Sequence, residues 1–175
     1  RKYFCYDCYV PLNDDPTEIP RLTLPTNVTV IRHPKEKISK SSIVPSKIIA
    51  PDQVTIEHWM DVPELIGPDE DPNSVVILFP SDDAVDVGTM TPEELLKIKR
   101  VYLIDCTWNQ TYHFLKQANV SQIKKVKIQT EKTVFWRYQR VAESNLATIE
   151  ALYYFFRDYD VALNCGCVYS KYDGK

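Results

Sequence analysis

The chain has little glycine, few histidines and no long apolar run, and each shortage argues against a class of function. Only 4 of the 175 residues are glycine, and neither GxGxxG nor GxxxxGK[ST] occurs, which argues against a Rossmann dinucleotide site or a phosphate-binding P-loop. No apolar segment approaches the roughly 20 residues of a membrane helix, and the first residues lack the apolar core of a secretory signal. The 3 histidines lie far apart without a partner cysteine or base, so no catalysis is assigned to them.

The 5 cysteines are an odd set that does not suit a disulfide framework, so a reducing, intracellular compartment is expected. Cys5 and Cys8 have the spacing of half a zinc site, but a closed site needs four ligands, and Cys165 and Cys167 complete it only if the termini meet. A reduced, metal-free pair is favoured over zinc. Because the chain begins with Arg1 rather than Met, we expect a fragment whose true ends are absent.

Charge is distributed unevenly along the chain. The net charge is −3, but residues 97–140 contain 10 Lys and Arg against 2 Asp and Glu, a local net charge of +8. Residues 1–96 contain 8 Lys and Arg against 17 Asp and Glu. A basic stretch of this size can neutralise several phosphates of a nucleic acid. The alternative interpretation is an ordinary set of solvated helix and strand exteriors.

The order of the predicted elements indicates one α/β domain over residues 26–175, preceded by an extended segment over 1–25. Apolar runs predict strands, and helical periodicity with capping signals predicts helices. Strands are predicted over 28–33, 47–50, 75–79, 101–105 and 126–129, and helices over 91–100, 108–118 and 144–159. The segment 61–73, rich in proline and aspartate, predicts an exposed loop. Alternating strands and helices predict right-handed crossovers and a mostly parallel sheet flanked by helices.

Two strand ends bring polar and aromatic groups to one edge of this sheet. The run VVILF ends at Pro80 and Ser81, and VYLID ends at Asp105, which Thr107 and Trp108 follow at a helix start. The carboxyl ends of parallel strands share an edge, where such folds bind ligands, so we expect one crevice lined by these residues. The structural alternatives are capping roles for the aspartate and threonine, a core tryptophan and a plain strand-exit turn.

Five segments resemble the DTW-domain family, which is named for the Asp, Thr and Trp of a DxTW motif. They are, in order, RKYFCYDCYVPL, VIRHPKEKISKSS, VVILFPSDDA, LIDCTWNQT and FWRYQRVAESNLATIEALYYFF. They are most similar to the eukaryotic tRNA-uridine aminocarboxypropyltransferases of that family. The resemblance implies a SPOUT-related fold whose C-terminal part forms a knot-like cradle for S-adenosylmethionine. It also implies transfer of the 3-amino-3-carboxypropyl group to N3 of a tRNA uridine, release of methylthioadenosine, and residence in the nucleus.

In the reaction that the resemblance implies, Asp105 is the expected reaction-centre residue, which orients the donor and also takes the N3 proton. Pro80, Ser81, Thr107 and Trp108 are implied contacts of S-adenosylmethionine.

A final motif of the family supplies Thr148 and Glu150 as further contacts with S-adenosylmethionine. Ala147 stands where relatives tend to have serine, which removes a hydroxyl from that motif. Glu150 has a structural alternative, because an acid in the first turn of a helix is favoured by the helix dipole. The loop of Lys40, Ser41 and Ser42 is another possible ligand loop.

Basic residues are the expected tRNA contacts. They are Lys124, Lys125, Lys127, Arg137 and Arg140. The two arginines are also suited to the methionine carboxylate, because guanidinium binds carboxylate and phosphate bidentately. Their alternative is an ordinary surface role.

Two functions of different class stay open at this point: a transferase that acts on tRNA, and a non-catalytic RNA-binding module that uses the basic stretch 97–140. A methyltransferase that uses the same donor is a third. The sequence does not identify the tRNA, the modified uridine or the oligomeric state.

Overall fold

The computed structural model describes residues 3–12, 15, 18–59, 65–67, 69–106, 108–129, 132–134 and 146–164. The strands are β1 (Asn27–Arg32), β2 (Val54–His58), β3 (Val75–Leu78), β4 (Val85–Asp86), β5 (Arg100–Asp105) and β6 (Lys124–Lys127). The α-helices are α1 (Val44–Ile49), α2 (Pro92–Lys97), α3 (Trp108–Leu115), α4 (Ala118–Ser121) and α5 (Thr148–Leu163). Short 3-10 helices span Ile38–Lys40, Pro72–Ser74 and Val87–Thr89. None of the helices in the described ranges is long and apolar enough to cross a membrane.

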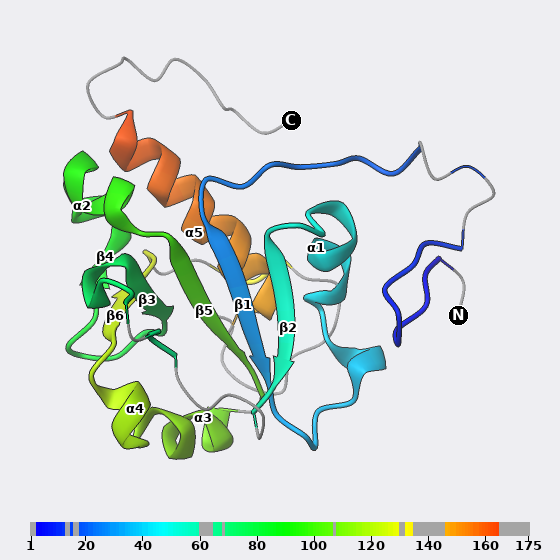
Figure 1. Cartoon of the computed structure of the whole chain (residues 1–175), viewed down its shortest axis with the longest axis horizontal. Coiled ribbons are helices and arrows are strands. Elements are labelled where there is room, and N and C mark those ends of the chain that lie inside the picture. The colour runs from blue at the N-terminus through cyan, green and yellow to red at the C-terminus, as the bar shows by residue number, and fades with distance from the viewer. Residues whose placement is uncertain are drawn as a thin grey trace.

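The six strands form one parallel sheet in the order β2-β1-β5-β3-β6-β4. This arrangement confirms the predicted α/β class and the parallel sheet. Since parallel strands point the same way, the segments that leave β1, β2, β3 and β5 gather at one edge of the sheet. In Figure 1, β1, β2 and β5 run toward the lower edge, and α3 begins there.

The two faces of the sheet have separate cores, because side chains alternate along each strand. One face packs against α2 and α5 in the larger core, which includes Val28, Val30, Val76, Leu95, Val101, Leu103, Leu152, Phe155 and Tyr159. The other face packs against α3 and α4 in a core that includes Ile31, Val75, Ile77, Tyr102, Phe114, Val120 and Ile123. By this alternation, Arg32 and Asp105 lie on the face that α5 covers.

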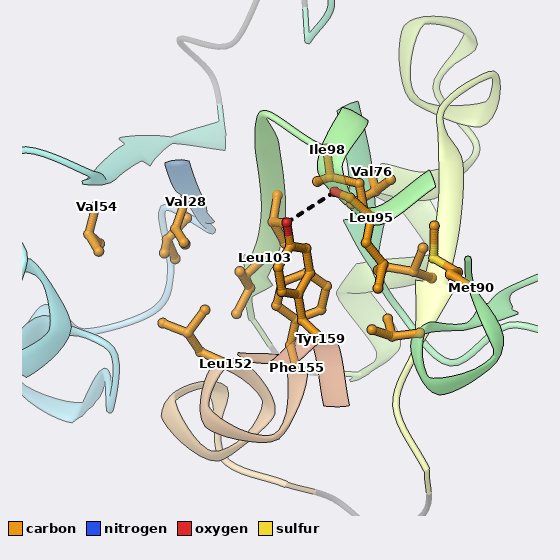
Figure 2. Packing of buried hydrophobic residues seen from close by; sticks show 14 of the residues in the cluster. Val28, Val54, Val76, Met90, Leu95, Ile98, Leu103, Leu152, Phe155 and Tyr159 are labelled. Atoms are coloured by element: carbon orange, nitrogen blue, oxygen red, sulfur yellow. Dashed lines mark hydrogen bonds between the residues drawn. The ribbon is translucent and has the colours of Figure 1, made fainter. Parts of the chain in front are cut away.

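Figure 2 shows how α5 is held in the larger core. Phe155 and Tyr159 project from this helix toward Leu103 and Leu95. The Tyr159 hydroxyl donates a hydrogen bond of 3.1 Å to the Leu95 carbonyl, and burial raises the pKa of the phenol. This packing fixes the direction of α5, whose first turn consequently lies beside the carboxyl end of β5.

The predicted strand over 47–50 is wrong, because these residues end α1 and follow it. Pro45 lies in the first turn of this helix, where a missing N–H breaks no helical hydrogen bond. On the side of β1 away from β5 lies β2, which the sequence reasoning did not predict. Its signal was the alternation of Val54 and Ile56 with polar residues.

Two predicted helices have different ends. The helix predicted over 91–100 has the expected capping box of Thr91 and Glu94 but ends at Lys97, since Lys99 N–H donates to the Ser74 carbonyl at 2.8 Å where the ladder of β5 begins. The helix predicted over 108–118 is divided into α3 and α4. The division occurs at Gln117, whose extended backbone (φ −65°, ψ 140°) ends the helical path.

The remaining differences are shifts of boundary. The strand predicted over 126–129 occupies Lys124–Lys127, where it pairs with β3 and β4. The last helix, predicted over 144–159, begins at Thr148 and continues to Leu163. In the loop predicted over 61–73, Leu65 is buried at 1% exposure in the smaller core, so this part is not an exposed loop.

Candidate active site

The chain changes direction across the sheet between β1 and β5. From β1 it passes through α1 to β2 on one side, and from β5 it passes through α3 and α4 to β6 on the other. The carboxyl ends of two strands whose connections diverge in this way frame the ligand crevice of open α/β sheets. Asp105 is the last residue of β5 and therefore lies at this point.

Asp105 is a buried carboxylate with two hydroxyl donors. It is 6% exposed. Ser41 Oγ donates to Oδ2 at 2.6 Å, and Thr148 Oγ1 donates to Oδ1 at 2.7 Å. Each carboxylate oxygen keeps a further lone-pair direction for a ligand. The cluster joins the end of β5, the loop after β1 and the first residue of α5, so the tertiary fold builds it from three distant segments.

Glu150 holds the start of α5 in place. Its Oε2 accepts hydrogen bonds from Ala147 N–H at 2.8 Å and Thr133 Oγ1 at 2.7 Å, and its Oε1 accepts one from Val134 N–H at 2.8 Å. The side chain is 8% exposed. Protein donors therefore engage both oxygens of the acid that the family resemblance assigned to S-adenosylmethionine.

Ala147 leaves the N-cap of α5 without a side-chain acceptor. Ser42 Oγ, from the loop after β1, accepts the Ile149 N–H at 3.3 Å instead. We expect Ala147→Ser to raise the free energy of unfolding by about 1 kcal/mol, because a serine N-cap accepts a first-turn N–H. Chemical denaturation measures this change. As a control, Ala151→Ser inside the same helix lowers stability slightly, and a neutral or destabilising Ala147→Ser contradicts the prediction.

The turn after β3 lies beside Asp105, as predicted, because β3 and β5 are neighbours in the sheet. Pro80 and Ser81 occupy this turn. Asp83 accepts a 2.7 Å hydrogen bond from Lys125 of β6, and this contact is the main cause that lowers the pKa of Asp83 to about 2. The buried Oγ of Ser81, two residues before Asp83, has no hydrogen-bond partner among the described residues.

The DxTW segment is described in part. Cys106 Sγ lies 3.1 Å from Thr111 Oγ1, and burial raises the pKa of the thiol, so Cys106 is a poor nucleophile. Thr107 lies outside the described residues. Trp108 is the first residue of α3, and only its backbone placement is described.

The basic residues divide into paired and unpaired groups. Lys125 pairs with Asp83, and its side chain is 14% exposed. Lys124 also pairs with an acid, since its Nζ lies 3.6 Å from Oε1 of Glu94 in α2. Lys127 forms no ion pair within the described ranges. Arg137 and Arg140 lie outside those ranges.

Cys5 and Cys8 lie on a short N-terminal hairpin. Cys5 N–H donates to the Val10 carbonyl at 2.8 Å, and Tyr9 has a left-handed backbone (φ 58°). Neither cysteine is in a disulfide. Among the described residues, no group of three side chains able to hold a metal occurs. Cys165 and Cys167 lie outside the described part of the chain.

Arg32 and Ser41 lie beside Asp105. Sequence reasoning did not indicate Arg32, and it indicated Ser41 only as part of a possible ligand loop. Arg32 ends β1 and is aligned with Asp105 across the β1–β5 ladder. Its signal was a charged residue two positions after Val30 on the buried face of an apolar strand. Ser41 carried no local signal for its contact, which spans 64 residues of chain.

Comparison with known proteins identifies the family. The DTW domain model matches residues 2–173 of this chain. The chain belongs to the DTW family. Its relatives include proteins named tRNA-uridine aminocarboxypropyltransferase 1. The Mus musculus protein is 31% identical over 99% of this chain and 69% of its own length, and the Rattus norvegicus protein is 32% identical with the same coverage. The Homo sapiens protein is 29% identical over 91% of this chain and 65% of its own length.

A solved structure shares the fold of this DTW chain. It is the SAM-dependent rRNA acp-transferase Tsr3 from Vulcanisaeta distributa, with a TM-score of 0.50 and 15% sequence identity, covering 82% of this chain and 80% of that one. The likeness concerns the fold, that is, the arrangement of the sheet and helices.

Proposed function

We propose that this DTW chain is an enzyme that transfers the 3-amino-3-carboxypropyl group of S-adenosylmethionine to N3 of a uridine in tRNA. The observation that carries this proposal is the match over 99% of the chain to proteins named for that reaction. The buried Asp105 cluster at the switch of chain direction supports the choice of this edge of the sheet as the site. In the reaction, the bond from sulfonium sulfur to the γ-carbon breaks, the N3–carbon bond forms, and methylthioadenosine leaves.

The residues at this edge suit such a donor. Of three buried side-chain polar atoms that lack a partner among the described residues, two lie here, Arg32 Nε and Ser81 Oγ. The third, Thr26 Oγ1, precedes β1 at the opposite edge. A polar ligand at the carboxyl edge can satisfy the first two atoms. Asp105 adds an anion that suits a sulfonium or an ammonium group.

S-adenosylmethionine supplies the electrophilic γ-carbon, and the protein supplies orientation. Asp105 holds the cationic part of the donor through the lone pairs that the two hydroxyls leave free, and it accepts the N3 proton. Ser41 and Thr148 fix the carboxylate plane. Such positioning matters because reacting atoms must meet at near-attack geometry.

We also propose that the fold is SPOUT-related and that the C-terminal part completes a knot-like cradle around the donor. The family resemblance and the placement of the first turn of α5 beside Asp105 support this proposal. The residues after Asn164 lie outside the described part of the chain.

The test of the proposed function uses the protein, S-adenosylmethionine and unmodified tRNA. We expect methylthioadenosine and acp3U to form in equal amounts. S-adenosylhomocysteine instead would indicate a methyltransferase. RNA binding without either product would favour the non-catalytic RNA-binding module.

Lys127 and Lys125 form a matched pair for testing the tRNA surface. We expect Lys127→Gln to reduce the slope of log affinity against log salt by about one unit, because it removes one phosphate contact. Lys125→Gln changes the slope much less, since Asp83 already neutralises Lys125. Binding of tRNA between about 50 and 200 mM salt measures both slopes. Equal changes in the two variants would contradict this division of the lysines.

A further inference from the structure

Arg32 and Asp105 are opposite charges on adjacent strands that do not pair with each other. They are aligned in the parallel β1–β5 ladder, and the alternation of each strand places both on the face covered by α5. Neighbouring strands lie about 4.8 Å apart, so the two side chains start within reach of a salt bridge. Asp105 instead directs its oxygens to Ser41 and Thr148.

The Arg32 guanidinium has no acid among the described residues within ion-pair distance. One terminal nitrogen, NH1, donates to the Glu36 carbonyl at 3.0 Å, and NH2 lies 3.3 Å from Nδ1 of His58, the last residue of β2. Its Nε is buried and has no acceptor in the described ranges. A partly buried cation next to a histidine ring and a carbonyl lacks the counter-charge that such groups normally receive.

The Nε side of the Arg32 guanidinium is open to an anion, because Nε has no hydrogen-bond partner among the described residues, while NH2 lies 3.3 and 3.4 Å from the two ring nitrogens of His58. Nε and one N–H of NH2 form one side of the planar fork, and this side is the bidentate surface that arginine presents to carboxylates. The bond to Glu36 fixes the fork by tying it to the turn after β1, where Glu36 N–H donates to the His33 carbonyl at 2.9 Å. The contacts with Glu36 and His58 together restrict the orientation of the fork.

We propose that Arg32 binds the α-carboxylate of the methionine part of S-adenosylmethionine, while Asp105 receives its α-ammonium group. This inference rests on the proposed function and names a ligand contact for Arg32 that the sequence reasoning did not. A zwitterionic amino acid carries its two charges a few ångströms apart. Arg32 and Asp105, which are aligned on adjacent strands and do not pair with each other, complement both charges. A donor without the carboxylate leaves the guanidinium edge empty.

The experiment compares S-adenosylmethionine with decarboxylated S-adenosylmethionine, which keeps the sulfonium and the amine. Isothermal titration calorimetry measures the affinity of both ligands for the wild-type chain and for the Arg32→Met and Arg32→Lys variants. For the wild type, we expect decarboxylation to weaken binding by about 10- to 100-fold, the range of a charged hydrogen-bonded contact. Arg32→Met is expected to lower the affinity for S-adenosylmethionine by a similar factor. It leaves the affinity for the decarboxylated ligand within about twofold of the wild-type value. Arg32→Lys is intermediate.

Arg100→Met is the matched control, because Arg100 begins β5 at the opposite edge of the sheet and pairs with Glu70 at 3.5 Å. It leaves both affinities unchanged. Wild-type protein that binds neither ligand overturns the proposed function. Wild-type protein that binds both ligands equally, or an Arg32→Met variant that weakens both equally, overturns only the role of Arg32. The comparison of the two ligands on the wild type needs no variant to fold.

Discussion

Asp105→Ala is expected to lower the rate of aminocarboxypropyl transfer by about 100- to 10,000-fold, the range for loss of a positioned acid–base group. Affinity for tRNA is expected to stay within a few fold, because a buried anion is unsuited to contact with a phosphate. Single-turnover formation of methylthioadenosine measures the rate. A filter-binding assay with the same tRNA measures the affinity.

The expected loss is large because Asp105 connects three segments and, in the proposed site, also faces the donor. Without the carboxylate, the hydroxyls of Ser41 and Thr148 lose their acceptor in a buried site, which costs about 1 to 3 kcal/mol for each unsatisfied group. The donor loses its anionic partner at the same time. Asp105→Asn separates the two effects, since an amide of the same shape keeps one acceptor oxygen but has no charge.

Asp158→Asn is the control for the effect of replacing a buried acid that lies outside the proposed site. Asp158 is 7% exposed on α5 and accepts hydrogen bonds from Arg157, so its loss affects stability. It lies away from the switch between β1 and β5, and the rate for each folded molecule is expected to stay unchanged. A folded Asp105→Asn variant with wild-type turnover would remove Asp105 from the chemistry.

Glu150→Gln is expected to lower the free energy of unfolding by about 2 to 4 kcal/mol, because three donors point at its carboxylate and hydrogen bonds to charged groups are strong. The amide NH2 of glutamine would face one of these donors instead of accepting from it. Affinity for S-adenosylmethionine, measured well below the melting temperature, changes by less than about threefold. Chemical denaturation gives the stability.

The control for Glu150 is Glu93→Gln. Glu93 is an exposed acid in the first turn of α2, and its loss is expected to cost no more than about 0.5 kcal/mol. If Glu150→Gln instead abolished donor binding while stability stayed unchanged, Glu150 would be a ligand of the donor, as the family resemblance implied.

The parallel sheet was predictable because VVILF and the first four residues of VYLID read as apolar runs, and the apolar residues of VTVIRH indicated a further strand. The capping box at Thr91 and Glu94 was equally visible, since its chemistry is local. Prediction failed at α1, where Ile48 and Ile49 suggested a strand. Tertiary packing and Pro45 decide that segment, and propensity alone does not reveal such an override.

The site was predictable at strand ends and unpredictable across the sheet. Asp105 and the turn at Pro80 and Ser81 follow apolar runs, so a rule about parallel sheets places them together. The contact of Asp105 with Ser41 depends on the loop after β1, and that loop has no periodicity. Arg32 was overlooked because a single charged residue at the end of an apolar strand usually indicates that the strand becomes exposed to solvent there.

The Asp105 cluster joins segments that are far apart in the sequence, and this separation affects how the protein folds during synthesis. Its donors lie 64 residues before and 43 residues after it in the chain, and contacts of such separation form late in folding. During synthesis, β1 to β5 leave the ribosome before the segment that starts at Thr148 exists. A nascent chain halted before α5 therefore has Ser41 but not Thr148 as a donor to Asp105. The site is complete only when α5 docks on the sheet.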